Sequence, residues 1–125
     1  MKIFINNIPL TVKLADTKAK QSKGLQNTSN LSQDEGMLFC YPHEKKVSFW
    51  MKETTIPLSI AFIDKNMLIT QISDLEPLSE KSVKSNKISK WALEVNQGWF
   101  ADNNISVGDK VNIPVSKNIK IRVLK

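Results

Sequence analysis

Residues 49–54, Phe-Trp-Met-Lys-Glu-Thr, combine an aromatic ring, a cation, a carboxylate and a hydroxyl within one short segment. Side chains alternate between the two faces of an extended strand, so Trp50 and Lys52 are expected to share a face. Glu53 and Thr54 follow where the apolar pattern breaks. A pocket with a mostly apolar wall and a few polar groups directed at the ligand is typical of small-molecule binding sites. We therefore predict a ligand-binding site that includes Trp50, Lys52, Glu53 and Thr54.

Glu94 is a further candidate site residue, because it is an acid inside an alternating, mostly apolar run from Trp91 to Asn96. The alternation places Glu94 on the face opposite Leu93 and Val95. A buried carboxylate without a partner is costly, so an inward-facing Glu94 is expected to pair with Lys52. Such a pair has two interpretations: it holds two strands in register, with the tryptophans in the core, or it lines a binding pocket.

Most other site chemistries lack the residues that they need. Cys40 and His43 are the only cysteine and histidine, too few for a structural zinc site, and the carboxylates show no calcium-loop spacing. The four glycines form no phosphate-binding loop, and no nucleophile motif accompanies His43. Cys40, between two aromatic residues, is expected to be a small buried hydrophobe. The sequence therefore predicts no metal site and no cofactor.

The net charge of +6 comes almost entirely from lysine, with Arg122 as the single arginine. Arginine makes most bidentate contacts to bases and phosphates, so specific nucleic-acid binding is not expected. Four lysines recur at every third position of a polar stretch and form a candidate basic rim: Lys81, Lys84, Lys87 and Lys90. Such a rim attracts acidic partners, although a solvated loop kept soluble by lysine explains the same pattern.

The periodicity predicts a mainly β, single domain over residues 1–125. The pattern predicts a β-hairpin over residues 2–15, with Asn6-Asn7 at its turn. It also predicts a short helix from about Thr17 to Lys23 that Gly24 ends. Further strands are expected at 37–41, 47–51, 58–64, 67–72, 91–96, from 111 and at 117–124, with helical turns within 97–103 and polar loops at 42–46 and 73–90. About eight strands with one or two short helices favour a β-sandwich or barrel.

No segment of the chain is apolar over the length of a membrane span, and the opening Met1 to Ile5 is too short for the core of a signal peptide. The sequence on its own therefore predicts a cytoplasmic protein or, as the alternative, a mature chain from which a leader has been removed.

Three motifs carry a resemblance to a known family: Gly36-Met37-Leu38-Phe39, the run from Phe49 to Asp64, and Leu93 to Phe100. Together they resemble the DUF192 family, also called UPF0127, over nearly the whole chain. The resemblance implies a jelly-roll-like β fold and a family of unassigned biochemical activity, whose members are often exported.

The chain departs from the family's pattern at three positions. Gln26 follows Gly24-Leu25 where the family has methionine, Glu53 interrupts a Lys-Asn-Thr motif, and Ser59 replaces the aspartate of Pro-Leu-Asp. If that aspartate were catalytic in the family, Ser59 would make this chain inactive.

Three functions follow from these residues. The leading hypothesis is a non-enzymatic module that binds a small ligand or a partner around Trp50, Lys52, Glu53, Thr54 and Glu94. One alternative is a hydrolase that uses Glu53 and Glu94 as an acid/base pair, which requires the two carboxyl groups to face one cleft. The other is a scaffold protein that docks acidic partners through the basic rim.

Overall fold

The computed structural model describes residues 1–114, which begin with a tight hairpin. Strands β1 (Lys2–Ile5) and β2 (Ile8–Ala15) pair antiparallel, and the turn between them consists of Asn6 and Asn7. Both asparagines have positive φ angles, 50° and 66°, as the two central residues of a type I′ turn require. The predicted hairpin is therefore confirmed.

Helix α1 (Lys18–Lys23) follows as predicted and is fixed to the sheet. The Thr17 hydroxyl caps its first turn by accepting a hydrogen bond from the amide of Lys20 at 3.2 Å. Gly24 ends the helix with a φ of 49°. The Gln21 side-chain amide donates to the carbonyl oxygens of Ala15 at 3.2 Å and Cys40 at 2.8 Å, which ties the helix to two adjacent strands.

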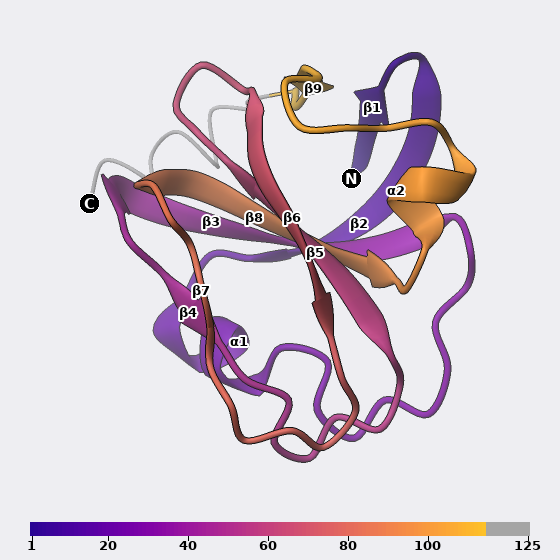
Figure 1. The fold of residues 1–125 in the computed structure, drawn as a ribbon, viewed down its shortest axis with the longest axis vertical. Helices are drawn as coiled ribbons and strands as arrows, with labels where there is room; N and C mark the ends of the chain where they lie inside the picture. The colour runs from indigo at the N-terminus through magenta and orange to yellow at the C-terminus, as the bar shows by residue number, and fades with distance from the viewer. Residues whose placement is uncertain (115–125) are drawn as a thin grey trace.

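Seven strands form one curled sheet that resembles half a barrel (Figure 1), in the order β6-β5-β8-β3-β2-β1-β9. The remaining members of this sheet are β3 (Glu35–Lys45), β5 (Leu58–Ile63), β6 (Ile69–Leu75), β8 (Ser89–Asn96) and β9 (Val111–Asn112). Neighbouring strands are antiparallel except for the parallel pair β2–β3. A separate two-stranded ribbon consists of β4 (Ser48–Phe49) and β7 (Val83–Lys84). With the short helix α2 (Trp99–Asp102), this architecture confirms the predicted mainly β fold.

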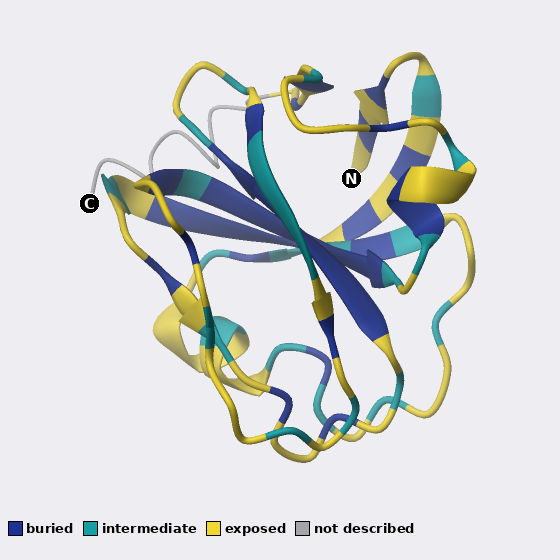
Figure 2. Ribbon diagram, in the orientation of Figure 1, coloured by how far each residue is buried: buried dark blue, intermediate teal, exposed yellow. Residues whose placement is uncertain are grey.

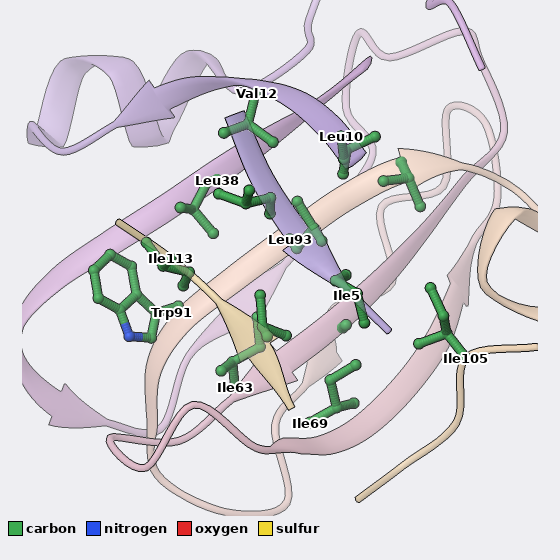
Figure 3. Packing of buried hydrophobic residues seen from close by; sticks show 14 of the residues in the cluster. Ile5, Leu10, Val12, Leu38, Ile63, Ile69, Trp91, Leu93, Ile105 and Ile113 are labelled. Atoms are coloured by element: carbon green, nitrogen blue, oxygen red, sulfur yellow. The ribbon is translucent and has the colours of Figure 1, made fainter. Parts of the chain in front are cut away.

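The central strands are buried on both faces (Figure 2), which explains the mostly apolar sequence of β5, with Ser59 as its one polar residue. On one face, Leu38, Trp91 and Leu93 belong to the core enclosed by the curl of the sheet (Figure 3). On the other face, Phe39 and Phe62 belong to a second core, to which partly buried side chains of the β4–β7 ribbon also contribute. The structure thus has an apolar layer on each side of the sheet.

Several predicted boundaries were wrong because pairing partners decide where a strand ends. The expected loop at 42–46 is mostly strand, since β3 continues to Lys45 after a shift of register that begins at Cys40. The expected strand at 47–51 pairs only at Ser48–Phe49. The stretch 73–90, predicted as loop, holds the end of β6, all of β7 and the start of β8. The strand predicted at 117–124 lies outside the described residues.

Candidate functional site

A cavity of about 490 Å³ lies over the second face of the sheet. Segments far apart in the sequence enclose it: α1 with the turn after it, the residues around β4, and side chains of β3 and β8. Figure 1 shows α1 and β4 next to each other at the lower left. Its wall includes the apolar side chains of Phe39, Met51 and Leu58 and the buried residue Thr54, which carries a hydroxyl group.

Glu94 of β8 lines this cavity. It lies opposite Met37 of β3 and Ile60 of β5, on the face predicted from the alternation. Only 4% of the residue is exposed to solvent. Within residues 1–114 its carboxyl group has no hydrogen bond and no salt bridge. Burial raises the pKa of Glu94 from 4.5 to about 8, so at neutral pH most molecules carry a neutral carboxylic acid here.

Tyr41 of β3 lines the same cavity, and its environment keeps its hydroxyl group protonated. Burial, and next the negative charge of Glu94, raise the pKa of Tyr41 above its usual value of 10.0. The ammonium of Lys45 lies 5.2 Å from the centroid of the Tyr41 ring. Lys90 fixes the backbone at this point, because its ammonium donates to the carbonyl oxygens of Tyr41 at 2.6 Å and Pro42 at 2.9 Å.

The structure brings three of the five predicted site residues to the cavity: Trp50, Thr54 and Glu94. Lys52 is exposed, and its ammonium lies 5.5 Å from the centroid of the Trp50 ring. The predicted ion pair between Lys52 and Glu94 is absent from the described part of the chain, so this prediction was wrong. The physical reason is that strand pairing ends at Phe49, so the alternation does not aim Lys52 at the sheet.

Glu53 also lies outside the cavity lining and has a backbone role instead. Its φ angle is 59°, in the left-handed region that disfavours most side chains but tolerates asparagine. Its carbonyl oxygen accepts a hydrogen bond from the amide of Asn27 at 3.0 Å. The asparagine of the Lys-Asn-Thr motif therefore suits this conformation better than the glutamate of this chain. The hydrolase hypothesis is not supported, because Glu53 and Glu94 do not line one cleft.

Ser59 belongs to the opposite face of the sheet, since it lies across from Val95 rather than Glu94. Its hydroxyl group donates to a carboxylate oxygen of Asp74 at 3.0 Å and accepts from the amide of Gly98 at 3.1 Å. The serine thus connects two strands to the turn before α2. The departure from Pro-Leu-Asp consequently does not alter the cavity.

The structure places the four lysines of the predicted basic rim in two kinds of environment. Lys81, Lys84 and Lys87 are exposed, whereas Lys90 is directed at the carbonyl oxygens of β3. Cys40 is buried as predicted, and burial raises the pKa of its thiol to about 11, which makes it a poor nucleophile.

Sequence reasoning missed several residues of the cavity, namely Tyr41, Lys18, Lys23, Lys45 and Lys46. In the sequence, Tyr41 belongs to an apolar run. Only the pairing of β3 with β8 shows on which face of the sheet its side chain lies. The four lysines occur at two distant places in the chain, where no spacing connects them.

A comparison with protein-family models matches residues 1–113 to DUF192, described as an uncharacterized ACR. This chain belongs to the DUF192 family. The family description assigns no activity, and no match was found among curated proteins.

Solved structures share the DUF192 fold of this chain. A candidate transcription regulator from Sinorhizobium meliloti 1021 has a TM-score of 0.84 and 30% sequence identity, covering 89% of each chain. A protein of unknown function from Novosphingobium aromaticivorans DSM 12444 has a TM-score of 0.87 and 30% identity, covering 90% of this chain and 84% of that one. Within residues 1–114, no helix has the length and apolar character needed to cross a membrane.

Proposed function

We propose that this DUF192 protein is a non-enzymatic module that binds a small molecule in the cavity over Glu94. One observation carries the proposal: a carboxyl group that is almost wholly buried, without a partner within residues 1–114, lines a cavity of about 490 Å³. Burying an unpaired carboxyl group is costly, and a ligand that bonds to it recovers part of that cost. Sites for small ligands commonly have volumes of about 300–1,000 Å³.

The residues around Glu94 favour ligand binding over hydrolase activity. A glycosidase needs a second carboxyl group across the cleft, and among residues 1–114 Glu94 is the only acidic residue of the cavity lining. His43 is exposed outside the lining, and Cys40 belongs to the core on the other face of the sheet. A nucleophile with an adjacent base is therefore not assembled around this acid.

A thermal-shift screen tests the proposal with sugars, nucleotides, amino acids, organic acids and amines. A ligand at about 100 times its dissociation constant should add roughly 2.7 kcal/mol of stability. The Ser48→Trp variant blocks the cavity, because Ser48 is exposed and lines it. The matched control is Ser106→Trp, at an exposed serine outside the lining.

We expect at least one compound class to stabilise the native protein and the Ser106→Trp control, but not the Ser48→Trp variant. A stabilisation that survives Ser48→Trp would place the ligand elsewhere and refute the proposal. A screen in which no class stabilises the protein would also count against it.

A further inference from the structure

We propose, on the basis of this binding function, that the ligand is a small organic anion. Its charged group would lie among the four lysines of the cavity lining, and its apolar part would extend along the aromatic wall. The four lysines are Lys18, Lys23, Lys45 and Lys46.

These four lysines, here called the mouth lysines, are all exposed and come from two segments that the fold brings together. Lys18 and Lys23 belong to α1, which Gln21 fixes to β2 and β3, whereas Lys45 ends β3 and Lys46 follows it. Within residues 1–114 the only salt bridge joins Lys20 to Asp16, so none of the mouth lysines is held in a salt bridge there. Positive charges around a concave site with apolar walls attract and concentrate anions.

The inner part of the cavity does not cancel this charge. Glu94 is the only acidic residue of the lining in the part of the chain that the structure describes, and burial keeps its carboxyl group neutral in most molecules at pH 7. In that form Glu94 is a hydrogen-bond donor and does not repel an anion. The Tyr41 hydroxyl is also protonated, so it too can donate to the ligand.

The aromatic wall favours an organic anion over inorganic phosphate. Phe49 is half-buried against Phe39, with ring centroids 4.9 Å apart, and both residues line the cavity. Trp50 also lines it but is 50% exposed, unlike the buried Trp91 and Trp99. Each methylene group that a ligand buries against such a wall should tighten binding roughly fourfold.

The test measures binding of acetate, butanoate, hexanoate and inorganic phosphate at constant ionic strength and pH 7, by titration calorimetry and tryptophan fluorescence. Hexan-1-ol and hexylammonium are the matched neutral and cationic probes. Affinity should rise from acetate to hexanoate, exceed that for phosphate, and be absent for hexylammonium. The fluorescence change on binding should come from Trp50, because it lines the cavity, whereas Trp91 and Trp99 are outside the lining.

The Lys45→Gln/Lys46→Gln variant removes two mouth lysines and should weaken hexanoate binding roughly thirtyfold, since each positive charge about 4 Å from an anion strengthens binding roughly fivefold even in water. The matched control, Lys2→Gln/Lys110→Gln, removes two exposed lysines outside the cavity lining and should bind as tightly as the native protein.

Three results would overturn the proposal. Equal binding of hexan-1-ol or hexylammonium, or unchanged hexanoate binding after Lys45→Gln/Lys46→Gln, would show that charge does not select the ligand. If such a neutral or cationic ligand is lost in Ser48→Trp, the binding function stands and only the anion class is wrong. If hexanoate binds Ser48→Trp as tightly as the native protein, both the anion class and the cavity as binding site are wrong.

Discussion

The Glu94→Gln substitution should make the protein's stability less dependent on pH. The pKa of Glu94 is about 8 in the folded protein, against 4.5 for the exposed group. Between these values the folded protein holds a proton that the unfolded chain has released. The free energy of unfolding therefore falls by about 1.4 kcal/mol for each pH unit, and the fall ends above the folded pKa.

The effect is large compared with the stability of a domain. From about pH 5 to about pH 9, Glu94 alone should lower the free energy of unfolding by about 4 kcal/mol, against a typical total of about 5–15 kcal/mol. Glutamine has nearly the same size and does not titrate. The difference in stability between Glu94→Gln and the native protein should therefore grow by about this amount over the interval.

Urea unfolding at a series of pH values, followed by tryptophan fluorescence, measures this difference. A constant offset between the two proteins does not affect the test, because only the slope against pH reports the titration. Glu80→Gln removes an exposed carboxylate and is the matched control, for which the difference should change little with pH. Parallel pH curves for Glu94→Gln and the native protein would refute the argument that Glu94 is buried and neutral.

Three further substitutions test the framework of the fold by urea unfolding. Gly36→Ala should cost about 2 kcal/mol or more, because its Cβ atom would lie 2.6 Å from the backbone oxygen of Glu94; unchanged stability would contradict this close approach. Ser59→Ala should cost about 1–2 kcal/mol, since it leaves the Gly98 amide without its acceptor, and a neutral effect would argue against that hydrogen bond. Glu53→Asn should add about 0.5–1 kcal/mol by relieving the left-handed backbone, whereas a loss of stability would show that the glutamate side chain matters.

The extent to which the site was predictable differs from residue to residue. The side of β8 on which Glu94 lies followed from the alternation of Trp91, Leu93 and Val95, and the structure agrees. The partner assigned to Glu94 was wrong because strand pairing stops at Phe49. The alternation of side chains predicts on which face of the sheet a residue lies only where its strand is paired. The sequence does not mark the residue at which pairing ends.

The sequence by itself determined the features that depend on local backbone physics. Asn6 and Asn7 specify the hairpin turn, Thr17 and Gly24 delimit α1, and the mostly apolar residues 58–63 predict a strand buried on both faces. Each depends on residues only a few positions apart.

Only the tertiary structure decided that a buried acid, a tyrosine and four lysines surround one cavity. Met37 and Ile60 lie on either side of Glu94 because three distant strands pair in one register. The mouth lysines meet because the side-chain hydrogen bonds of Gln21 hold α1 beside β3. Contacts between residues far apart in the chain arise from global packing, which no local pattern encodes.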